Sequence, residues 1–326
     1  MDAWDRWRLT DEDKMSMVRV NVPFSARRGC IAIGNFDGVH LGHAHMLCAL
    51  CQMAKRQNTV AVAVTFDPHP IAVLRPEFTP PILTTISERI SLLRNAGADE
   101  VVVLPVTTGL LQMTAEQFFD EVMCRQFEAI GIVEGPNFHF GRDRRGDVLL
   151  LQSLCRNARI ECRVMESLNA EGEMISSSRI RELLCQRSLA QAVQLLGHPY
   201  RLTGMVRHGS QRGRQIGFPT ANLFSIQTLL PAHGVYAALT RIDDRSYPVA
   251  VSIGPNPTFG EHREKVECHV DGFSGDLYDR ELQIDLLSEL RPLQSFGSVN
   301  DLIQQIGSDV EGCRFHAARW QTSIQS

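Results

Sequence analysis

The alternation of apolar strands with helices between residues 30 and 165 constrains the fold more than any other feature of this sequence. Residues 59–66 form a continuous run of mostly β-branched side chains, which is typical of a strand buried on both faces. The same pattern predicts strands at 30–33, 101–104, 129–133 and 159–165, and helices at 42–56, 87–96, 115–125 and 147–157. Such alternation indicates an α/β doubly wound parallel sheet, whose ligands lie beyond the carboxyl ends of the strands.

Three polar motifs follow directly after predicted strands, behind Ile33, Phe66 and Val133. Their placement agrees with the ligand edge of a parallel sheet. Between them, the proline-rich segment that ends at residue 81 is expected to form a loop, and Ser87 to cap the helix that follows.

From residue 201 the pattern changes to short strands separated by glycine turns. Strands are predicted at 201–207, 234–242, 247–253, 264–270 and 281–287, followed by a helix at 300–314. Short antiparallel strands of this kind indicate a small β-barrel. A chain of 326 residues also exceeds what one compact core usually holds. We therefore expect an N-terminal extension at 1–24 and two domains, at 25–190 and 191–318.

Composition and charge argue against several classes of function. The net charge of −4 gives no support to nucleic-acid binding through bulk electrostatics. No apolar run approaches the roughly 20 residues that span a bilayer, so no membrane association is expected. Nine scattered cysteines indicate thiols in a reducing cytoplasm rather than a disulfide frame. We expect a cytoplasmic protein that acts on small molecules; whether it forms a homo-oligomer is left open.

Cys48 and Cys51 form a C-x-x-C pair close to His43 and His45. A zinc site requires a second pair of ligands at suitable spacing, and the sequence offers none. We favour instead one apolar helix face, shared by the two thiols with Leu47, Leu50 and Ala54.

The motif after the first strand is Gly-Asn-Phe-Asp-Gly-Val-His-Leu-Gly-His, at residues 34–43. His40 and His43 are three residues apart across a helix start, so both can face one ligand. Asn35, Gly38 and Gly42 would let the backbone approach that ligand closely. A histidine near a helix N-terminus resists protonation, yet its N–H group still donates to phosphate oxygens. A lone H-x-x-H would more often be two surface histidines, but the full string predicts an anion-binding turn.

A second glycine-rich motif covers residues 208–222 and ends in Pro-Thr-Ala-Asn. It lacks the G-K-[ST] of a Walker loop. Thr220 and Asn222 would share one face of a strand, where two neutral oxygens can hold Mg²⁺ together with ATP phosphates. Glu267, in a later strand, would on its own be interpreted as an exposed carboxylate.

These motifs resemble the bifunctional riboflavin kinase/FAD synthetases of bacteria, whose N-terminal domain is an HxGH nucleotidylyltransferase. The resemblance rests on residues 34–43, 65–70, 135–141, 175–181 and 204–223, and continues to about residue 296. It implies that riboflavin is phosphorylated to FMN by ATP in the second domain. It further implies that the FMN phosphate attacks the α-phosphorus of ATP in the first domain, so that FAD and pyrophosphate form.

The resemblance also implies roles for residues of the first domain. Catalytic roles fall to His40, His43, Asn137 and Arg181. ATP and phosphate binding fall to Gly34, Phe36, Asp37, Gly38, Gly42, Ser177, Ser178 and Arg179. Flavin binding falls to Phe66, Pro68 and His69, although the prolines at 68 and 70 fit a structural turn equally well. The arginines at 142, 144 and 145 are better explained as a solvated loop than as a phosphate site.

In the second domain the resemblance implies that Glu267 is the catalytic base of the kinase and that Thr220 and Asn222 hold Mg²⁺. The ATP loop would contain Gly209, Gly213, Arg214, Gly217 and Pro219, and Arg291 would bind the flavin. Three residues depart from the family pattern: Ser252 replaces an asparagine, Asp279 a glycine and Leu293 a glutamate. These departures leave open the alternative of an FMN adenylyltransferase whose barrel only binds flavin. A non-catalytic flavin-sensing module is a third hypothesis, and the intact His40, His43, Asn137, Thr220 and Glu267 argue against it.

Overall fold

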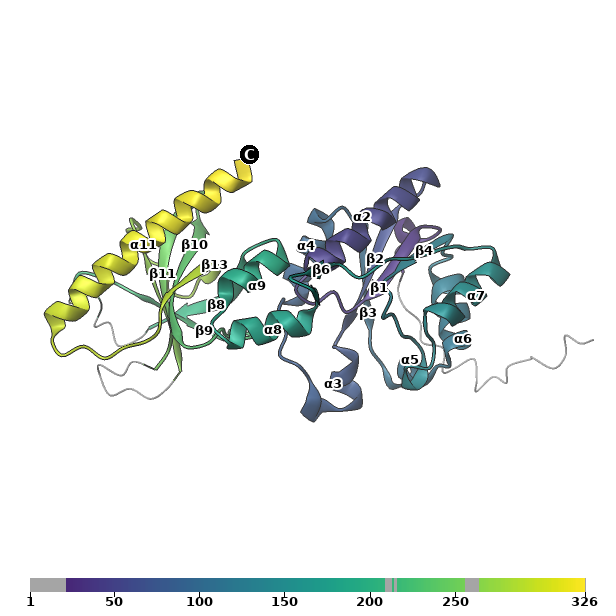
Figure 1. Cartoon of the computed structure of the whole chain (residues 1–326), viewed down its shortest axis with the longest axis horizontal. Helices are drawn as coiled ribbons and strands as arrows, with labels where there is room; N and C mark the ends of the chain where they lie inside the picture. The colour runs from purple at the N-terminus through teal and green to yellow at the C-terminus, as the bar shows by residue number, and fades with distance from the viewer. Residues whose placement is uncertain (1–21, 209–212, 214–215, 256–263, 326) are drawn as a thin grey trace, which may run out of the picture. The chain divides into compact units, whose positions relative to one another are not determined.

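The computed structural model describes residues 22–208, 213, 216–255 and 264–325 (Figure 1). It divides into two compact units, Met1–Pro80 with Ile86–Met174, and Pro81–Thr85 with Ile175–Ser326. Most of the extension expected at residues 1–24 lies outside the described residues.

The first unit contains a five-stranded parallel sheet, as the sequence predicts, and the strands lie in the order β3-β2-β1-β4-β5. Its strands are β1 (Cys30–Gly34), β2 (Ala61–Asp67), β3 (Glu100–Pro105), β4 (Gly131–Glu134) and β5 (Glu161–Val164). The chain order reverses between β1 and β4, so the ligand crevice of such a sheet is expected at their carboxyl ends.

Apolar side chains cover both faces of this sheet. Ile31 and Val62 belong to one buried cluster, whereas their neighbours Ala32 and Ala63 belong to the other. This alternation follows from the two-residue period of a strand, and it explains why the sequence shows continuous apolar runs. The helices of this unit are α2 (Leu41–Arg56), α3 (Pro70–Leu74), α4 (Ile86–Asn95), α5 (Thr108–Gln112), α6 (Ala115–Phe118) and α7 (Val148–Ala158).

The structure corrects several sequence-based expectations in this unit. The segment expected to be a loop contains α3 and the 3₁₀ turn η3 (Pro76–Phe78). Proline at the first position of each explains this, because that site needs no N–H donor and favours the fixed φ of proline. Helix α4 begins at Ile86, so Ser87 lies inside the helix rather than at its cap. The helix predicted at 115–125 continues from α6 as a π-helix, η4 (Phe119–Gln126).

The C-x-x-C pair lies on α2. Cys51 is half-buried with its Sγ 3.1 Å from the Gly97 carbonyl oxygen, but Cys48 is exposed, so the expected apolar face includes only one of the two thiols. In the described part of the chain, no group of three or more histidine, cysteine, aspartate or glutamate side chains is placed to hold a metal ion. No helix among the same residues is both long and apolar enough to cross a membrane.

The second unit contains a closed six-stranded antiparallel barrel, in the order β10-β11-β12-β9-β8-β13. Its strands are β8 (Tyr200–Arg207), β9 (Ala221–Phe224), β10 (Gly234–Ile242), β11 (Arg245–Gly254), β12 (Lys265–Val270) and β13 (Glu281–Arg291). The strand expected to carry both Thr220 and Asn222 is β9, which is only four residues long and begins after Thr220. It joins its two neighbours through three residue pairs each.

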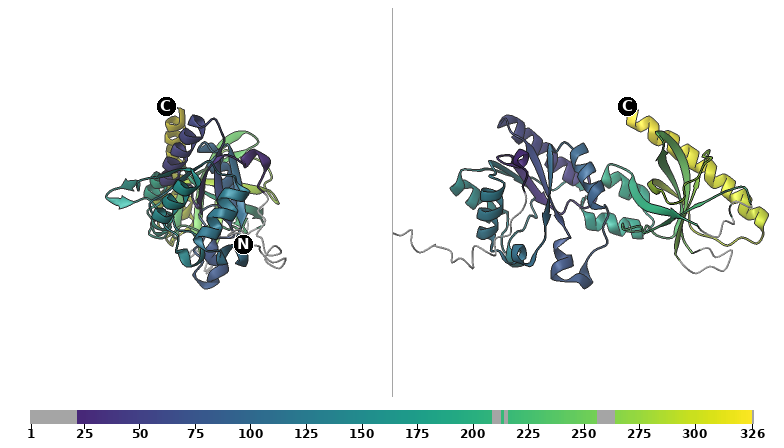
Figure 2. Two further views of the ribbon diagram at one scale, coloured as in Figure 1. Left: turned by 90° about the vertical axis from the view of Figure 1, so that its right-hand side faces the viewer. Right: turned by 180° about the vertical axis from the view of Figure 1, so that it is seen from behind.

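Among the described residues, three helices accompany the barrel: α8 (Ser177–Cys185), α9 (Leu189–Leu196) and α11 (Val299–Gln325). Helix α11 continues well beyond the predicted end at residue 314 and lies along the outside of the barrel, against β10, β11 and β13 (Figures 1 and 2). A bidentate ion pair between Arg291 of β13 and Asp309 of α11 fastens this contact, with N···O distances of 2.9 and 2.7 Å.

Candidate active sites

The turn between β1 and α2 brings two predicted histidines into direct contact. His40 is the N-cap of α2, and its Nδ1 accepts a hydrogen bond from the His43 backbone N–H at 3.4 Å. The two rings stack with centroids 3.6 Å apart, and the Phe36 ring lies edge-on to His43 at 5.1 Å. Both imidazoles thus lie at the N-terminus of a 16-residue helix, where the backbone favours anions.

The backbone of this turn is held in a rarely populated conformation. Phe36 and Val39 have φ angles of 47° and 37°, and Gly38 has a φ angle of 82°. A bulky and a β-branched residue at positive φ cost free energy, and such strain concentrates at functional sites.

His43 is held in its neutral form. Burial lowers the pKa of His43 well below 6.5, and the charges of His40 and Arg89 lower it further. Its Nδ1 is buried and has no hydrogen-bond partner among the described residues. Buried polar atoms are rarely left without a partner outside functional sites, so this nitrogen is consistent with a ligand site.

Arg89 on α4 was not identified from the sequence. Its Nη2 lies 3.2 Å from Asp37 Oδ1, and its Nη1 lies 3.3 Å from both Thr65 Oγ1 and the Phe66 carbonyl oxygen. The Thr65 hydroxyl in turn donates to the Asn35 carbonyl oxygen at 3.0 Å. The guanidinium therefore ties the turn after β1 to the end of β2. A single arginine within a helical pattern carries no sequence signal for this role.

Glu134 closes the other side of the crevice. The pairing of β1 with β4 stops at Ile31 and Ile132, and the Glu134 Oε1 then accepts a hydrogen bond from the Ile33 N–H at 2.8 Å. Burial raises the pKa of Glu134 well above 4.5, although the hydrogen bond from Ile33 opposes the shift. The side chain thus replaces a missing ladder bond where the two strands diverge. Asn137 follows three residues later, exposed, with its Nδ2 3.3 Å from Met174 Sδ.

The predicted flavin residues lie at the end of β2. Phe66 is half-buried and packs on the core, and the Asp67–Pro68 peptide bond is cis. His69 caps α3 through its Nδ1, which accepts from the Ile71 N–H at 3.2 Å, while its Nε2 lies 3.0 Å from the Asn35 amide nitrogen.

The His69 contacts determine how the Asn35 amide is oriented. A ring whose Nδ1 accepts must carry its proton on Nε2, so Nε2 donates and needs an oxygen opposite it. We therefore assign the amide with its oxygen toward His69, because only hydrogen-bond partners distinguish the two ends of an amide. Asn35 thus links the first two motifs through its side chain, in addition to the backbone role expected from the sequence.

The predicted phosphate residues of α8 lie in the second unit. Ser176 is the N-cap, and its Oγ accepts from the Arg179 N–H at 3.3 Å, while Ser177 and Ser178 form the first two helical positions. Arg181 donates from Nε to the Pro81 carbonyl oxygen at 2.7 Å. The serine run thus supplies the N-cap, as the sequence allows, and of its three residues Ser178 is exposed while Ser176 and Ser177 are half-buried.

The barrel aligns the predicted kinase residues on adjacent strands. Asn222 of β9 lies directly opposite Glu267 of β12, and Glu267 lies directly opposite Ser252 of β11. Residues directly opposite in an antiparallel pair point to the same face, so these side chains are neighbours. Arg207 of β8 extends the row on the other side of Asn222. One residue that departs from the family pattern, Ser252, is therefore adjacent to the predicted base.

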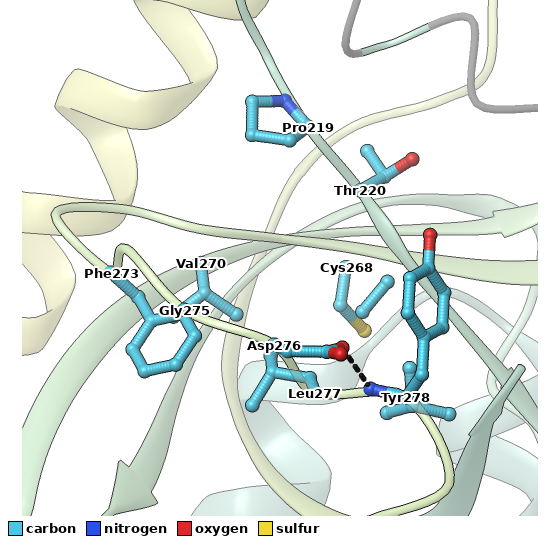
Figure 3. A pocket seen from close by; sticks show the side chains of 11 residues that line it. Pro219, Thr220, Cys268, Val270, Phe273, Gly275, Asp276, Leu277 and Tyr278 are labelled. Atoms are coloured by element: carbon cyan, nitrogen blue, oxygen red, sulfur yellow. Dashed lines mark hydrogen bonds between the residues drawn. The ribbon is translucent and has the colours of Figure 1, made fainter. Parts of the chain in front are cut away.

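A cavity of about 120 Å³ lies beside Thr220. Phe273 and Tyr278 lie at opposite ends of it, with Cys268 between them (Figure 3). The Asp276 carboxylate accepts from the Tyr278 N–H at 2.9 Å and so shapes the loop that lines this cavity. The ring of His208 stacks on the Tyr278 ring with centroids 3.7 Å apart.

The glycine loop is described only in part, because Gly209 and Arg214 lie outside the described residues. Gly213 accepts from the Phe218 N–H at 2.9 Å, and an added Cβ would lie 2.3 Å from the Phe218 carbonyl oxygen. Only glycine fits there. Gly217 has a φ of 86°, and Pro219 is exposed, with its carbonyl oxygen 2.9 Å from His269 Nδ1.

Asp279 and Leu293, the other two departures from the family pattern, and Arg291 each contact another part of the barrel unit. Asp279 adopts a φ of 57°, which explains why glycine suits this position, and it forms an ion pair with Arg207. Leu293 lies near Gly254, where an added Cβ would be 2.8 Å from Leu293 Cδ1. Besides its pairing with Asp309, Arg291 donates from Nη1 to the Pro292 carbonyl oxygen at 3.2 Å.

Comparisons with known proteins cover both units. The FAD synthetase family model matches residues 23–179, and the riboflavin kinase family model matches residues 196–316. The bifunctional riboflavin kinase/FMN adenylyltransferase of Escherichia coli K12 is 33% identical over 291 residues, which cover 89% of this chain and 93% of that protein. Its namesake from Pseudomonas fluorescens is 35% identical over 293 residues, covering 89% and 94%. A crystal structure titled as a macrolide-efflux protein from Streptococcus pneumoniae superposes with a TM-score of 0.81 at 30% identity, covering 90% of this chain and 95% of that one.

Proposed function

The chain belongs to the family of bifunctional riboflavin kinase/FMN adenylyltransferases, and from this premise we propose which of its residues carry out the two reactions. The protein phosphorylates riboflavin to FMN with ATP and then transfers the adenylyl group of a second ATP to FMN, which gives FAD and pyrophosphate.

Adenylyl transfer is assigned to the crevice between β1 and β4. The stacked pair of His40 and His43 at the N-terminus of α2 carries this assignment. A phosphate oxygen of FMN attacks the α-phosphorus of ATP, and the bond to pyrophosphate breaks. The imidazoles donate N–H groups to the phosphates as negative charge moves onto pyrophosphate, and no covalent enzyme intermediate is needed. Asn137, at the same edge of the sheet, helps to place the reacting phosphates.

Other residues of this reaction are proposed with the roles that the family implies. The backbone of the β1–α2 turn, at Gly34, Phe36, Gly38 and Gly42, approaches the ATP phosphates. Ser177, Ser178, Arg179 and Arg181 of α8 are retained as phosphate-binding candidates, the arginines through planar guanidinium groups. Phe66, Pro68 and His69 form the flavin side.

Riboflavin phosphorylation is assigned to the row of side chains on β9 and β12. Glu267 orients the ribityl 5′-hydroxyl and takes its proton as that oxygen attacks the γ-phosphorus of ATP. The neutral oxygens of Thr220 and Asn222 fit Mg²⁺, which takes few protein ligands and completes its shell with phosphates and water. When bound, Mg²⁺ neutralises charge on the transferred phosphoryl group.

The cavity beside Thr220 is proposed to bind the ATP of the kinase step, together with the loop that contains Gly209, Gly213, Arg214, Gly217 and Pro219. Arg291 is retained as a flavin-binding candidate. All nine cysteines lie in the described chain as free thiols, which supports the proposed cytoplasmic location.

The two-site assignment is tested with a single substitution. In E267Q the carboxylate is lost while the amide keeps its size, so FMN formation from riboflavin, Mg²⁺ and ATP should disappear. Conversion of added FMN to FAD should continue at the rate of the unmodified protein. Equal loss of both steps would contradict two separate sites. FAD from FMN but none from riboflavin in the unmodified protein would instead favour an adenylyltransferase with a silent barrel.

A further inference from the structure

Asp37 is part of the phosphate-binding motif, but its position argues against direct contact with ATP. Asp37 is only 2% exposed, and its Oδ1 lies 3.2 Å from Arg89 Nη2. A buried carboxylate in an ion pair cannot also meet a solvated triphosphate, and its negative charge would repel one. Asp37 therefore binds Arg89 within the protein rather than ATP.

Arg89 itself is equally enclosed. It is 7% exposed, and its guanidinium contacts groups of the protein itself. Its two terminal nitrogens reach three groups: the Asp37 carboxylate, the Thr65 hydroxyl and the Phe66 carbonyl oxygen. These groups belong to the turn after β1 and to the end of β2, which are the two segments assigned to ATP and to the flavin.

The strained turn explains why such a fastening is needed. Phe36 and Val39 lie on either side of Asp37 and Gly38 with positive φ angles, a conformation that persists only when its surroundings enforce it. The Arg89–Asp37 ion pair helps to hold this conformation, because Asp37 lies within the turn and Arg89 also contacts the Thr65 hydroxyl. The stacked geometry of His40 and His43 follows directly after this turn.

We propose that Arg89 is a positioning residue for adenylyl transfer, which holds the β1–α2 turn against the end of β2 so that His40 and His43 are aligned for phosphate. This role rests on the adenylyl transfer assigned above. It also has an electrostatic part, because the positive charge of Arg89 disfavours an imidazolium at His43. Two further titratable groups of this cluster are His40, stacked on His43, and Asp37, paired with Arg89.

Two substitutions of Arg89 distinguish the contribution of its hydrogen-bond geometry from that of its positive charge. R89K keeps the charge but not the planar fork that reaches three acceptors at once. R89M removes both. R94M is the matched control, because Arg94 is exposed on the same helix, five positions further along.

In R89M, kcat for FAD formation from FMN should fall by about hundredfold, the size expected when reacting groups lose their alignment. R89K should lie between R89M and the unmodified protein, and R94M should match the latter. Riboflavin phosphorylation, assigned to the second unit, should stay within about twofold in all three variants, within the usual spread for changes outside a site.

The pH profile provides the readout that a purely structural role would not change. Loss of the Arg89 charge, with Asp37 still present, raises the pKa of His43, so the acid limb of the adenylylation profile should move to higher pH in R89M. R89K and R94M should keep the limb of the unmodified protein.

The outcomes are distinct. An R89K protein with unchanged kcat would overturn the positioning role, and this holds even if R89M is too unstable to assay. An unmoved acid limb in an active R89M protein would overturn the electrostatic part. An unmodified protein that makes no FAD from FMN would contradict the proposed function itself and not the role of Arg89.

Discussion

Replacing Glu134 by glutamine should stabilise the first unit relative to the unmodified protein, and this advantage should grow as pH rises. Glu134 is only 1% exposed, and burial raises its pKa well above 4.5. In the interval above 4.5 and below that raised pKa, the folded chain binds one proton more than the unfolded chain. Stability is therefore lost as pH rises through this interval. Glutamine keeps the side-chain volume and an oxygen for the Ile33 N–H, but does not titrate.

The size of this effect follows from how steeply the free energy of unfolding changes with pH. One proton of difference changes the free energy of unfolding by about 1.4 kcal/mol per pH unit. Across two pH units, from about 5 to 7, the advantage of E134Q over the unmodified protein should therefore grow by up to about 2.8 kcal/mol. The difference in free energy of unfolding between the two proteins should not change with pH below the ordinary range of a glutamate pKa. There residue 134 is neutral in both proteins, whether folded or unfolded.

Native-state hydrogen exchange is the suitable assay, because it reports on the first unit separately from the barrel. Protection of peptides that cover β1 and β4 would be measured at pH 5, 6 and 7 and corrected for intrinsic exchange. E116Q, on the exposed first turn of α6, makes the same chemical change without burial. A free-energy difference that stays constant with pH, or shrinks as pH rises, would refute the reasoning.

Two further predictions concern the second glycine loop and the first two motifs. In G213A the added Cβ would lie 2.3 Å from the Phe218 carbonyl oxygen, so the loop must shift. KM for ATP in riboflavin phosphorylation should rise by about tenfold or more while FMN adenylylation is unchanged, and an unchanged KM would show that the loop tolerates the shift. His69 should carry its proton on Nε2, which ¹⁵N NMR of histidine-labelled protein can determine, with H69Q to assign the signal; a proton on Nδ1 would contradict the Asn35 amide orientation.

The architecture could be predicted because it depends on periodic patterns. The run at residues 59–66 indicated burial on both faces, and β2 is buried between two helical layers. The short strands separated by glycine turns after residue 200 indicated a barrel, and the barrel is closed. The contact of His40 with His43 was predictable because a helix brings residues three apart together.

The long-range contacts that hold the proposed adenylyl-transfer site in place could not be predicted in this way. Arg89 and Asp37 are 52 positions apart, and Glu134 and Ile33 are 101 positions apart. Such pairs form only after the sheet has brought its strands together, and no local pattern encodes them. The loop expected before residue 81 was wrong for another reason: its prolines were interpreted as loop and turn residues, whereas at the first helical position they favour a helix.

The short strand β9 has a consequence for how the barrel folds. It is the link through which the barrel closes, and each of its edges is held by only three residue pairs. The same strand carries Asn222 and sets it opposite Glu267. If β9 detached, β8 and β12 would become open edges that can pair with other chains, and the proposed metal ligand would separate from the proposed base. Closure of the barrel and assembly of the proposed kinase site thus depend on the same strand, so protection against aggregation and kinase activity should be lost together.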